Sequence, residues 1–176
     1  MKILTTQIRG LLERIAEGQD ESMEETARLL AQALVGEGRI ILTAFDEMEA
    51  VTATALDGVE PMEGAIRYTK ELELTTADRV WLLVRRADHP AALELARELA
   101  DQFIPFAVLA ADKEEDDNEL ASLAYTYIST GLKKGLIPGP TGERIVQPHA
   151  LAALFVYEAV KLSIDDMLAD EDDELL

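Results

Sequence analysis

The chain has 176 residues, of which 35 are acidic and 16 are lysine or arginine, and its formal net charge is −19. So negative a chain repels phosphate backbones and anionic lipid headgroups, which argues against nucleic acid and membranes as partners. The absence of cysteine excludes disulfides, thiolate zinc sites and a cysteine nucleophile. No apolar run approaches the roughly 20 residues that span a bilayer, and the polar N-terminal segment lacks the pattern of a signal peptide. We therefore expect a cytoplasmic protein.

Helical and strand patterns follow one another along the chain. Two helical patterns come first, with apolar residues at helical spacing over 8–15 and 23–34. Short apolar runs then predict buried strands at 39–45, 65–69, 79–84, 104–111 and 125–130, and helical patterns lie among them at 46–56, at 90–102 and within 112–124. Residues 131–147 have the composition of a loop. Pro148 then opens a long apolar helix, since proline is tolerated in a first turn.

The strand patterns indicate a parallel sheet. The runs are apolar throughout instead of alternating, as expected for strands that are covered on both faces. Helices between strands supply the right-handed crossovers that parallel neighbours require. The prediction is an α/β fold, a three-layer α/β/α sandwich around a five-stranded parallel sheet. It forms one domain over 1–168, and an acidic tail follows over 169–176.

In such sheets ligands bind beyond the carboxyl ends of the strands, so the first loop to consider is TAFDEMEA. Thr43 lies near the end of the first predicted strand and is a candidate ligand contact. Asp46 and Glu49 have the spacing of a capping box, and Glu47 would lie favourably at the positive end of the helix. The alternative is that Glu47 or Glu49 acts as a general acid or base in enolising a sugar.

The turn after the third predicted strand has the opposite charge. Arg85 and Arg86 are followed by Asp88, the expected N-cap of the next helix, and by His89. Guanidinium groups and free helix N–H groups together suit a phosphate or carboxylate, so all four residues are candidate ligand contacts. The alternative is that both arginines pair with acidic neighbours in the first loop or in the acidic run over 112–117.

The segment before the last helix supplies two further candidates. Gln147 is a candidate ligand contact, and His149 is either a catalytic base or a surface or interface residue at the helix start. Lys133 and Lys134 are expected in a solvated turn. No His, Asp and Glu cluster has metal-ligand spacing, and no Ser–His–Asp arrangement is indicated, so neither a metal nor a cofactor is expected.

The order of parts resembles the sugar isomerase (SIS) domain family, especially the phosphoheptose isomerases. The resemblance rests on two N-terminal helices, a five-stranded α/β unit and the closing stretch GERIVQPHALAALFVYEAVKL. In the family a similar Arg-Ile-x-Gln-x-x-His stretch leads into the closing helix. It is matched here by Arg144, Ile145, Gln147 and, one place early, His149. The resemblance implies a flavodoxin-type strand order and a sugar-phosphate ligand.

The resemblance also implies a homo-oligomer, either a dimer or a tetramer. Amphipathic helices at both chain ends could supply the contact between subunits. Leu154, Phe155 and Tyr157 are the expected exposed apolar residues on the last helix.

The chain departs from the family at the motifs that carry the chemistry. The family's first loop reads Gly-Asn-Gly-Gly-Ser where this chain has TAFDEMEA, and its Ser/Thr-Ser-Gly phosphate loop is replaced by VRRADHP. Threading places Val51 and Ala55 near the active-site His and Glu of the isomerases. Phe155 stands eight residues after Gln147, where the family has a histidine.

Three hypotheses follow. The first is a phosphosugar-binding protein with a degenerate isomerase site, which binds a small anionic metabolite. The second is an active sugar-phosphate isomerase that uses non-standard residues. The third is an oligomeric interaction protein without a ligand.

Overall fold

The five predicted strands form one sheet. The computed structural model describes residues 1–115 and 117–174, with side chains up to residue 169. The strands are β1 (Ile40–Ala44), β2 (Ala65–Arg67), β3 (Arg79–Leu83), β4 (Phe106–Ala110) and β5 (Thr126–Ser129). All neighbours pair in parallel in the order β2-β1-β3-β4-β5. The predicted parallel sheet and its flavodoxin-type order are therefore confirmed.

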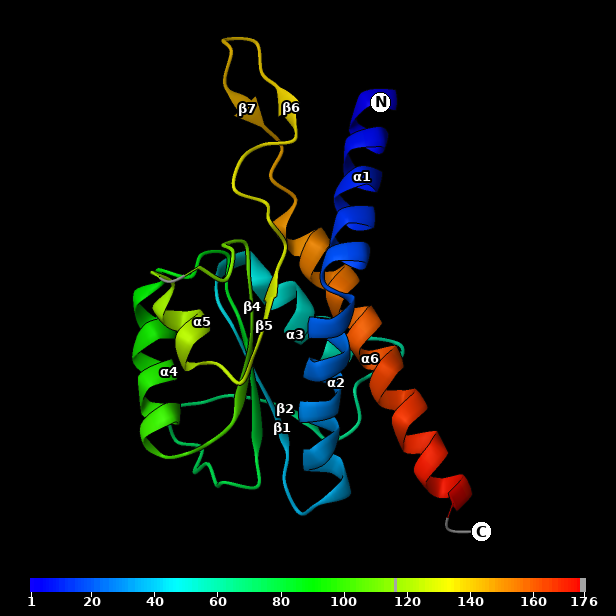
Figure 1. Cartoon of the computed structure of the whole chain (residues 1–176), viewed down its shortest axis with the longest axis vertical. Coiled ribbons are helices and arrows are strands. Elements are labelled where there is room, and N and C mark those ends of the chain that lie inside the picture. The colour runs from blue at the N-terminus through cyan, green and yellow to red at the C-terminus, as the bar shows by residue number, and fades with distance from the viewer. Residues whose placement is uncertain (116, 175–176) are drawn as a thin grey trace.

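Helices cover both faces of the sheet and complete the three layers (Figure 1). One face carries α1 (Lys2–Gly18), α2 (Asp20–Val35), α3 (Glu49–Asp57) and α6 (His149–Glu174), and the other carries α4 (Pro90–Asp101) and α5 (Glu119–Leu123). Successive strand residues serve opposite layers, because side chains alternate along a strand. Leu42 and Trp81 therefore pack in the α2–α6 layer, while Ile41 and Leu82 pack beneath α4.

The last helix is anchored in the core. α6 packs against α2 and α3, and this packing turns Tyr157 onto the sheet, where it is fully buried. The prediction that Tyr157 is exposed is therefore wrong. Leu154 and Phe155 are partly buried and pack against the same core. Among the described residues, no helix combines the length and the apolarity needed to cross a bilayer.

The helix α6 continues to Glu174, so the first residues of the expected acidic tail, 169–176, are helical. The side chains from residue 170 onward and residues 175–176 lie outside the described part of the chain.

The long segment 131–147 is not only a loop. It contains a short antiparallel hairpin of β6 (Ile137–Pro138) and β7 (Arg144–Ile145), in which Gly139 N–H donates to Glu143 O at 2.7 Å. This hairpin and the start of α1 extend together beyond the carboxyl edge of the sheet (Figure 1). Strands of two residues leave no periodic pattern, so the sequence does not predict them.

Candidate functional site

The loop after β1 leaves the strand through a single turn of 3-10 helix, η1 (Asp46–Met48), before α3 begins. Asp46 has a left-handed backbone with φ of 54°, and neither η1 nor α3 has a side-chain cap. The capping box predicted for Asp46 and Glu49 is therefore wrong. The left-handed turn instead directs the Asp46 carboxylate toward Arg85, whose Nη2 lies 3.8 Å away.

Arg85 faces the first loop. Its Nη1 lies 3.3 Å from both carboxylate oxygens of Glu47, in addition to the more distant Asp46. The Arg85 side chain is 45% exposed, so water still reaches it. Glu49, in contrast, forms its ion pair with Arg67 on the neighbouring strand β2. Both carboxylates that we considered as acid or base candidates are thus held by an arginine.

Arg86 turns the other way, toward the loop after β4. Its Nη2 lies 3.3 Å from Asp112, and its Nε lies 3.8 Å from Asp88. Asp112 also accepts a hydrogen bond from Ala87 N–H at 2.8 Å, which fixes the carboxylate against the turn. Arg85 and Arg86, which we call the arginine turn, were expected either to contact an anionic ligand or to pair with acidic neighbours. The structure shows them in ion pairs with acidic neighbours.

The helix behind this turn is capped by a histidine and not by Asp88. His89 is the N-cap of α4, and its Nδ1 accepts from Ala92 N–H at 3.3 Å. The Asp88 side chain is largely exposed and faces Arg86, so its predicted capping role is wrong. The His89 ring also packs in a tilted arrangement against Phe45, with 4.5 Å between ring centroids, and Nε2 lies 3.9 Å from Asp46.

Replacing His89 with alanine should lower the free energy of unfolding by about 1 kcal/mol, because Ala92 N–H loses its side-chain partner. Asparagine at the same position should restore most of the loss, since it is a good N-cap. Urea denaturation followed by circular dichroism measures the difference. The matched control is Asp88→Ala, which should leave stability unchanged; an equal loss in this variant would contradict the assignment.

His149 lies beneath the arginine turn and is only 4% exposed. Burial lowers the pKa of its ring. The negative charge of Glu47 opposes this lowering, and the positive charges of Arg85 and Arg86 lower the pKa further. The ring is therefore neutral at pH 7, and Nε2 lies 3.4 Å from Gln147 Oε1. The expectation of a surface histidine is wrong, because the start of α6 is inserted under the loops at the carboxyl edge.

The structure thus brings most of the predicted site residues to one edge. Thr43 is nearly buried at the end of β1, and Gln147 is exposed beside the start of α6. The two arginines of the turn face four carboxylates: Asp46, Glu47, Asp88 and Asp112. The local charge is therefore negative, which opposes the binding of a phosphate at this point.

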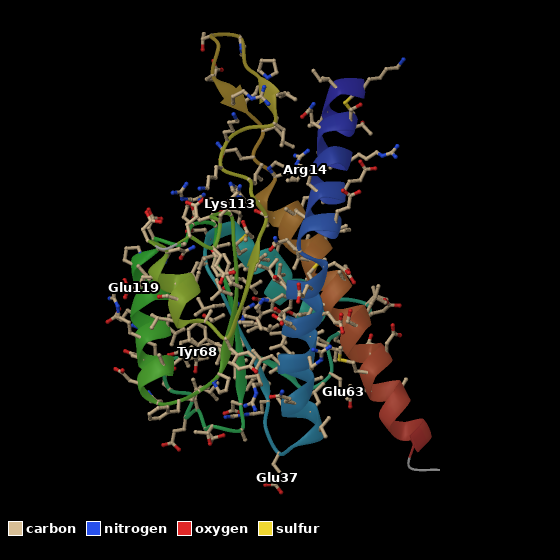
Figure 2. All side chains as sticks on the ribbon, viewed as in Figure 1. Arg14, Glu37, Glu63, Tyr68, Lys113 and Glu119 are labelled. Carbon is tan, nitrogen blue, oxygen red and sulfur yellow. The ribbon has the colours of Figure 1, made fainter. Side chains whose placement is uncertain are left out.

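A second site at the same edge was missed by the sequence reasoning. A cavity of about 800 Å³ lies between α1, the loop after β5 and the β6–β7 hairpin. Five cations line it: Arg14, Lys113, Lys133, Lys134 and Arg144, and we refer to it as the basic cavity. Figure 2 shows Arg14 and Lys113 toward this end of the molecule, whereas Glu37 lies at the opposite end. The only sequence signal was the Lys133–Lys134 pair.

No metal centre is formed by the described residues, since they include no group of three His, Cys, Asp or Glu side chains that could hold an ion.

The fold and the position of the sites at the carboxyl edge define a class of protein. The chain has the fold of the sugar isomerase (SIS) domains, as comparison with solved structures shows.

Two solved structures illustrate the likeness. Phosphoheptose isomerase GmhA from Neisseria gonorrhoeae superposes with a TM-score of 0.65 at 12% identity, over 93% of this chain and 95% of that one. The NanR protein of Vibrio vulnificus, complexed with ManNAc-6P, superposes with a TM-score of 0.56 at 13% identity, over 99% of this chain and 70% of that one. At such identities the likeness shows the fold.

The sequence family to which the chain belongs is a more specific group than the proteins that share the SIS fold. The chain belongs to the family described as a domain of unknown function, DUF2529, whose model matches residues 1–168. It is also 29% identical over 171 residues to the uncharacterised protein YwjG of Bacillus subtilis (strain 168), over 97% of this chain and 98% of that protein.

Proposed function

We propose that this protein binds a small anionic metabolite of the sugar-phosphate class at the carboxyl edge of its sheet and does not catalyse ordinary phosphoheptose isomerisation. The observation that carries the proposal is the distribution of positive charge. In a chain of net charge −19, five of the 16 cationic side chains surround one cavity at the edge where parallel sheets bind ligands. The ligand in the ManNAc-6P complex of NanR supports the same class.

The absence of ordinary isomerisation follows from the residues at the threaded motif positions. Val51 and Ala55 are fully buried in the core beneath α6, where the isomerases have a histidine and a glutamate. Phe155 packs against the same core. Buried alkyl and phenyl groups cannot transfer a proton, so the site is degenerate with respect to that chemistry.

A variant isomerase is the second candidate, and one observation favours it. Burial lowers the pKa of His149, and the negative charge of Glu47, which lies on the neighbouring loop, partly opposes this lowering. A carboxylate beside a neutral imidazole is a pair that could move a proton between two sugar carbons. To act in this way, Glu47 would have to break its ion pair with Arg85.

The protein is also proposed to form a homo-oligomer, which all three hypotheses expect. An apolar groove of about 520 Å³ lies between α1 and α6 and is lined by Leu4, Ile8, Leu12 and Phe155. Such a surface on projecting helices suits a second copy of the chain. Sedimentation equilibrium measures the state, and a monomer at all concentrations would contradict it.

A thermal-shift experiment tests the proposed function. The panel consists of fructose 6-phosphate, glucosamine 6-phosphate and sedoheptulose 7-phosphate. The controls are the corresponding unphosphorylated sugars: fructose, glucosamine and sedoheptulose. A phosphorylated ligand at 100 times its Kd should stabilise the protein by about 2.7 kcal/mol and raise its Tm by several degrees. No shift with any member would contradict the proposal. Isomerase activity that is lost in Glu47→Gln would select the variant enzyme instead.

A further inference from the structure

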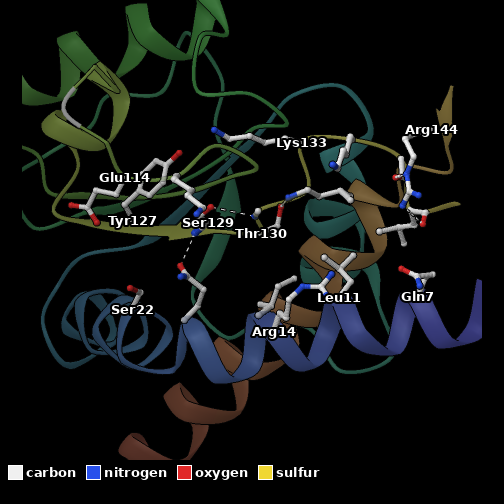
Figure 3. A pocket seen from close by; sticks show the side chains of 18 residues that line it. Gln7, Leu11, Arg14, Ser22, Glu114, Tyr127, Ser129, Thr130, Lys133 and Arg144 are labelled. Carbon is white, nitrogen blue, oxygen red and sulfur yellow. Dashed lines mark hydrogen bonds between the residues drawn. The ribbon is translucent and has the colours of Figure 1, made fainter. Parts of the chain in front are cut away.

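The basic cavity is built from segments that are distant in the sequence. α1 forms one wall, the loop after β5 forms the floor, and the β6–β7 hairpin closes the end (Figure 3). Arg14 extends from the helix, and Lys133 and Arg144 extend from the opposite side. The volume of about 800 Å³ falls within the range of small-molecule sites.

The cations of this cavity differ from most other cations of the described chain in having no ion-pair partner, although Lys113 and Lys133 also border a pocket that contains Asp112 and Asp117. Among the side chains that the structure describes (1–115 and 117–169), none of the five cations forms an ion pair, although eight of the other cations do. Among the described residues of the lining, Glu114 is the single carboxylate. In an otherwise acidic molecule, this gathering of unpaired cations makes a local positive potential that attracts an anion.

The walls of the cavity are held in place by hydrogen bonds. Arg144 donates from Nε to Gly135 O at 3.0 Å and from Nη2 to Leu136 O at 2.6 Å, which ties the hairpin to the loop. Gln19 Oε1 accepts from Ser129 N–H at 2.7 Å and joins the end of α1 to β5. A site with fixed walls loses little conformational entropy when a ligand binds.

The backbone of the loop after β5 is also constrained at two glycines. Gly131 has a left-handed φ of 65°, and its N–H donates to Ser129 Oγ at 3.2 Å. A Cβ on Gly135 would lie 2.4 Å from the backbone of Arg144, so only glycine permits this approach. The sequence STGLKKG thus places Lys133 and Lys134 at the rim in one defined loop.

The remaining lining indicates the kind of anion. Hydroxyl and amide groups of Gln7, Ser22 and Thr130 offer hydrogen bonds to a polyol. The one aromatic residue in the lining, Tyr127, is nearly buried, and its hydroxyl already bonds Asn118 and Asp112 O. The cavity therefore provides no free ring on which a nucleobase could stack.

We infer that the basic cavity, and not the arginine turn, is the anion-binding site, and that it takes the phosphate of a phosphorylated sugar. This inference rests on the proposed function and assigns it a place. Arg14, Lys133 and Lys134 contact the phosphate, while the hydroxyl and amide groups contact the sugar. The arginine turn stays occupied by its own four carboxylates.

Calorimetric titration of four proteins with the sugar-phosphate panel and with inorganic phosphate tests this assignment. Arg14→Gln combined with Lys133→Gln and Lys134→Gln should raise the Kd by at least about tenfold, because charge-assisted hydrogen bonds to phosphate are lost. Arg85→Gln with Arg86→Gln should bind as the wild type does. Lys2→Gln combined with Arg9→Gln and Lys70→Gln, three exposed cations outside the cavity, controls for the loss of three positive charges. Circular dichroism and the ligand-free Tm establish that each variant is folded.

The possible outcomes test two statements separately: that the basic cavity is the anion-binding site (the assignment), and that the protein binds a sugar phosphate (the function). Loss of binding in the cavity variant alone supports both. Wild-type-like binding by the cavity variant, with loss in the arginine-turn variant, overturns the assignment and leaves the function standing. If the wild type binds neither inorganic phosphate nor any sugar phosphate, both are overturned.

Discussion

Replacing Trp81 with alanine should lower the free energy of unfolding by about 3–5 kcal/mol. Trp81 lies in the middle of β3, a central strand, and is fully buried. Its ring is stacked on Tyr157 of α6 with 6.5 Å between centroids. The truncation would therefore leave a cavity between the sheet and the long helix that closes the fold. Urea or guanidinium denaturation at pH 7 measures the loss.

Two conservative variants distinguish packing from hydrogen bonding at this contact. Neither Trp81 Nε1 nor Tyr157 Oη has a hydrogen-bond partner among the described residues, although both atoms are buried. Burial raises the pKa of Tyr157 to about 12, so the phenol is neutral at pH 7. Tyr157→Phe removes an unsatisfied hydroxyl and should leave stability unchanged or raise it by about 1 kcal/mol. Trp81→Phe should cost much less than Trp81→Ala. A large loss in Tyr157→Phe would show that the hydroxyl has a partner in solution.

The sheet was predictable because its strands carry a strong and simple signal. Runs such as 79–84 are apolar on both faces, and the helices between them leave few alternatives for strand order once the SIS resemblance is added. The β6–β7 hairpin was not predictable, since its four strand residues include a proline and show no alternation. Tyr157 was placed on the wrong side of α6 because that helix is apolar around most of its circumference.

The candidate site was predictable only in part. The sequence placed Arg85, Arg86 and Glu47 at one edge of the sheet, and the structure brings them there. It did not predict the left-handed Asp46, since that conformation depends on the turn that leaves β1. It also missed the basic cavity, because Arg14 and Lys133 come to line one cavity only when α1 folds back over the end of β5.

Replacing Asp78 with alanine should lower the free energy of unfolding by about 3 kcal/mol, because it removes a buried carboxylate that accepts hydrogen bonds from the partly exposed Arg39 and from two backbone N–H groups. Asp78 is 1% exposed at the amino end of β3. Its Oδ1 accepts from Arg39 Nε at 2.9 Å and from Arg39 N–H at 3.0 Å, and its Oδ2 accepts from Arg39 Nη2 and from Thr75 N–H, both at 2.8 Å. One carboxylate thus joins the start of β1 to the loop before β3. Alanine would leave the two backbone N–H groups without their partner.

The same contacts give this residue a defined pH dependence. The hydrogen bond from Arg39 lowers the pKa of Asp78 from its usual 3.8 to about 2. Because the folded pKa is the lower one, the carboxylate stabilises the fold fully above about pH 4, and this contribution of roughly 2 kcal/mol is lost as the pH falls from 3.8 toward 2. The stability difference between the wild type and Asp78→Asn should therefore be constant from pH 7 to pH 5 and should shrink below pH 4.

Two controls make the interpretation of the Asp78 variants specific. Glu13→Gln breaks an exposed pair with Arg9 on α1 and should leave stability unchanged, because water screens such pairs. Asp78 lies at the edge of the sheet opposite the basic cavity, so its variants should still bind an anion wherever they remain folded. A difference between wild type and Asp78→Asn that persists undiminished at pH 2 would show that packing, and not the charge of this carboxylate, holds the amino ends of β1 and β3 together.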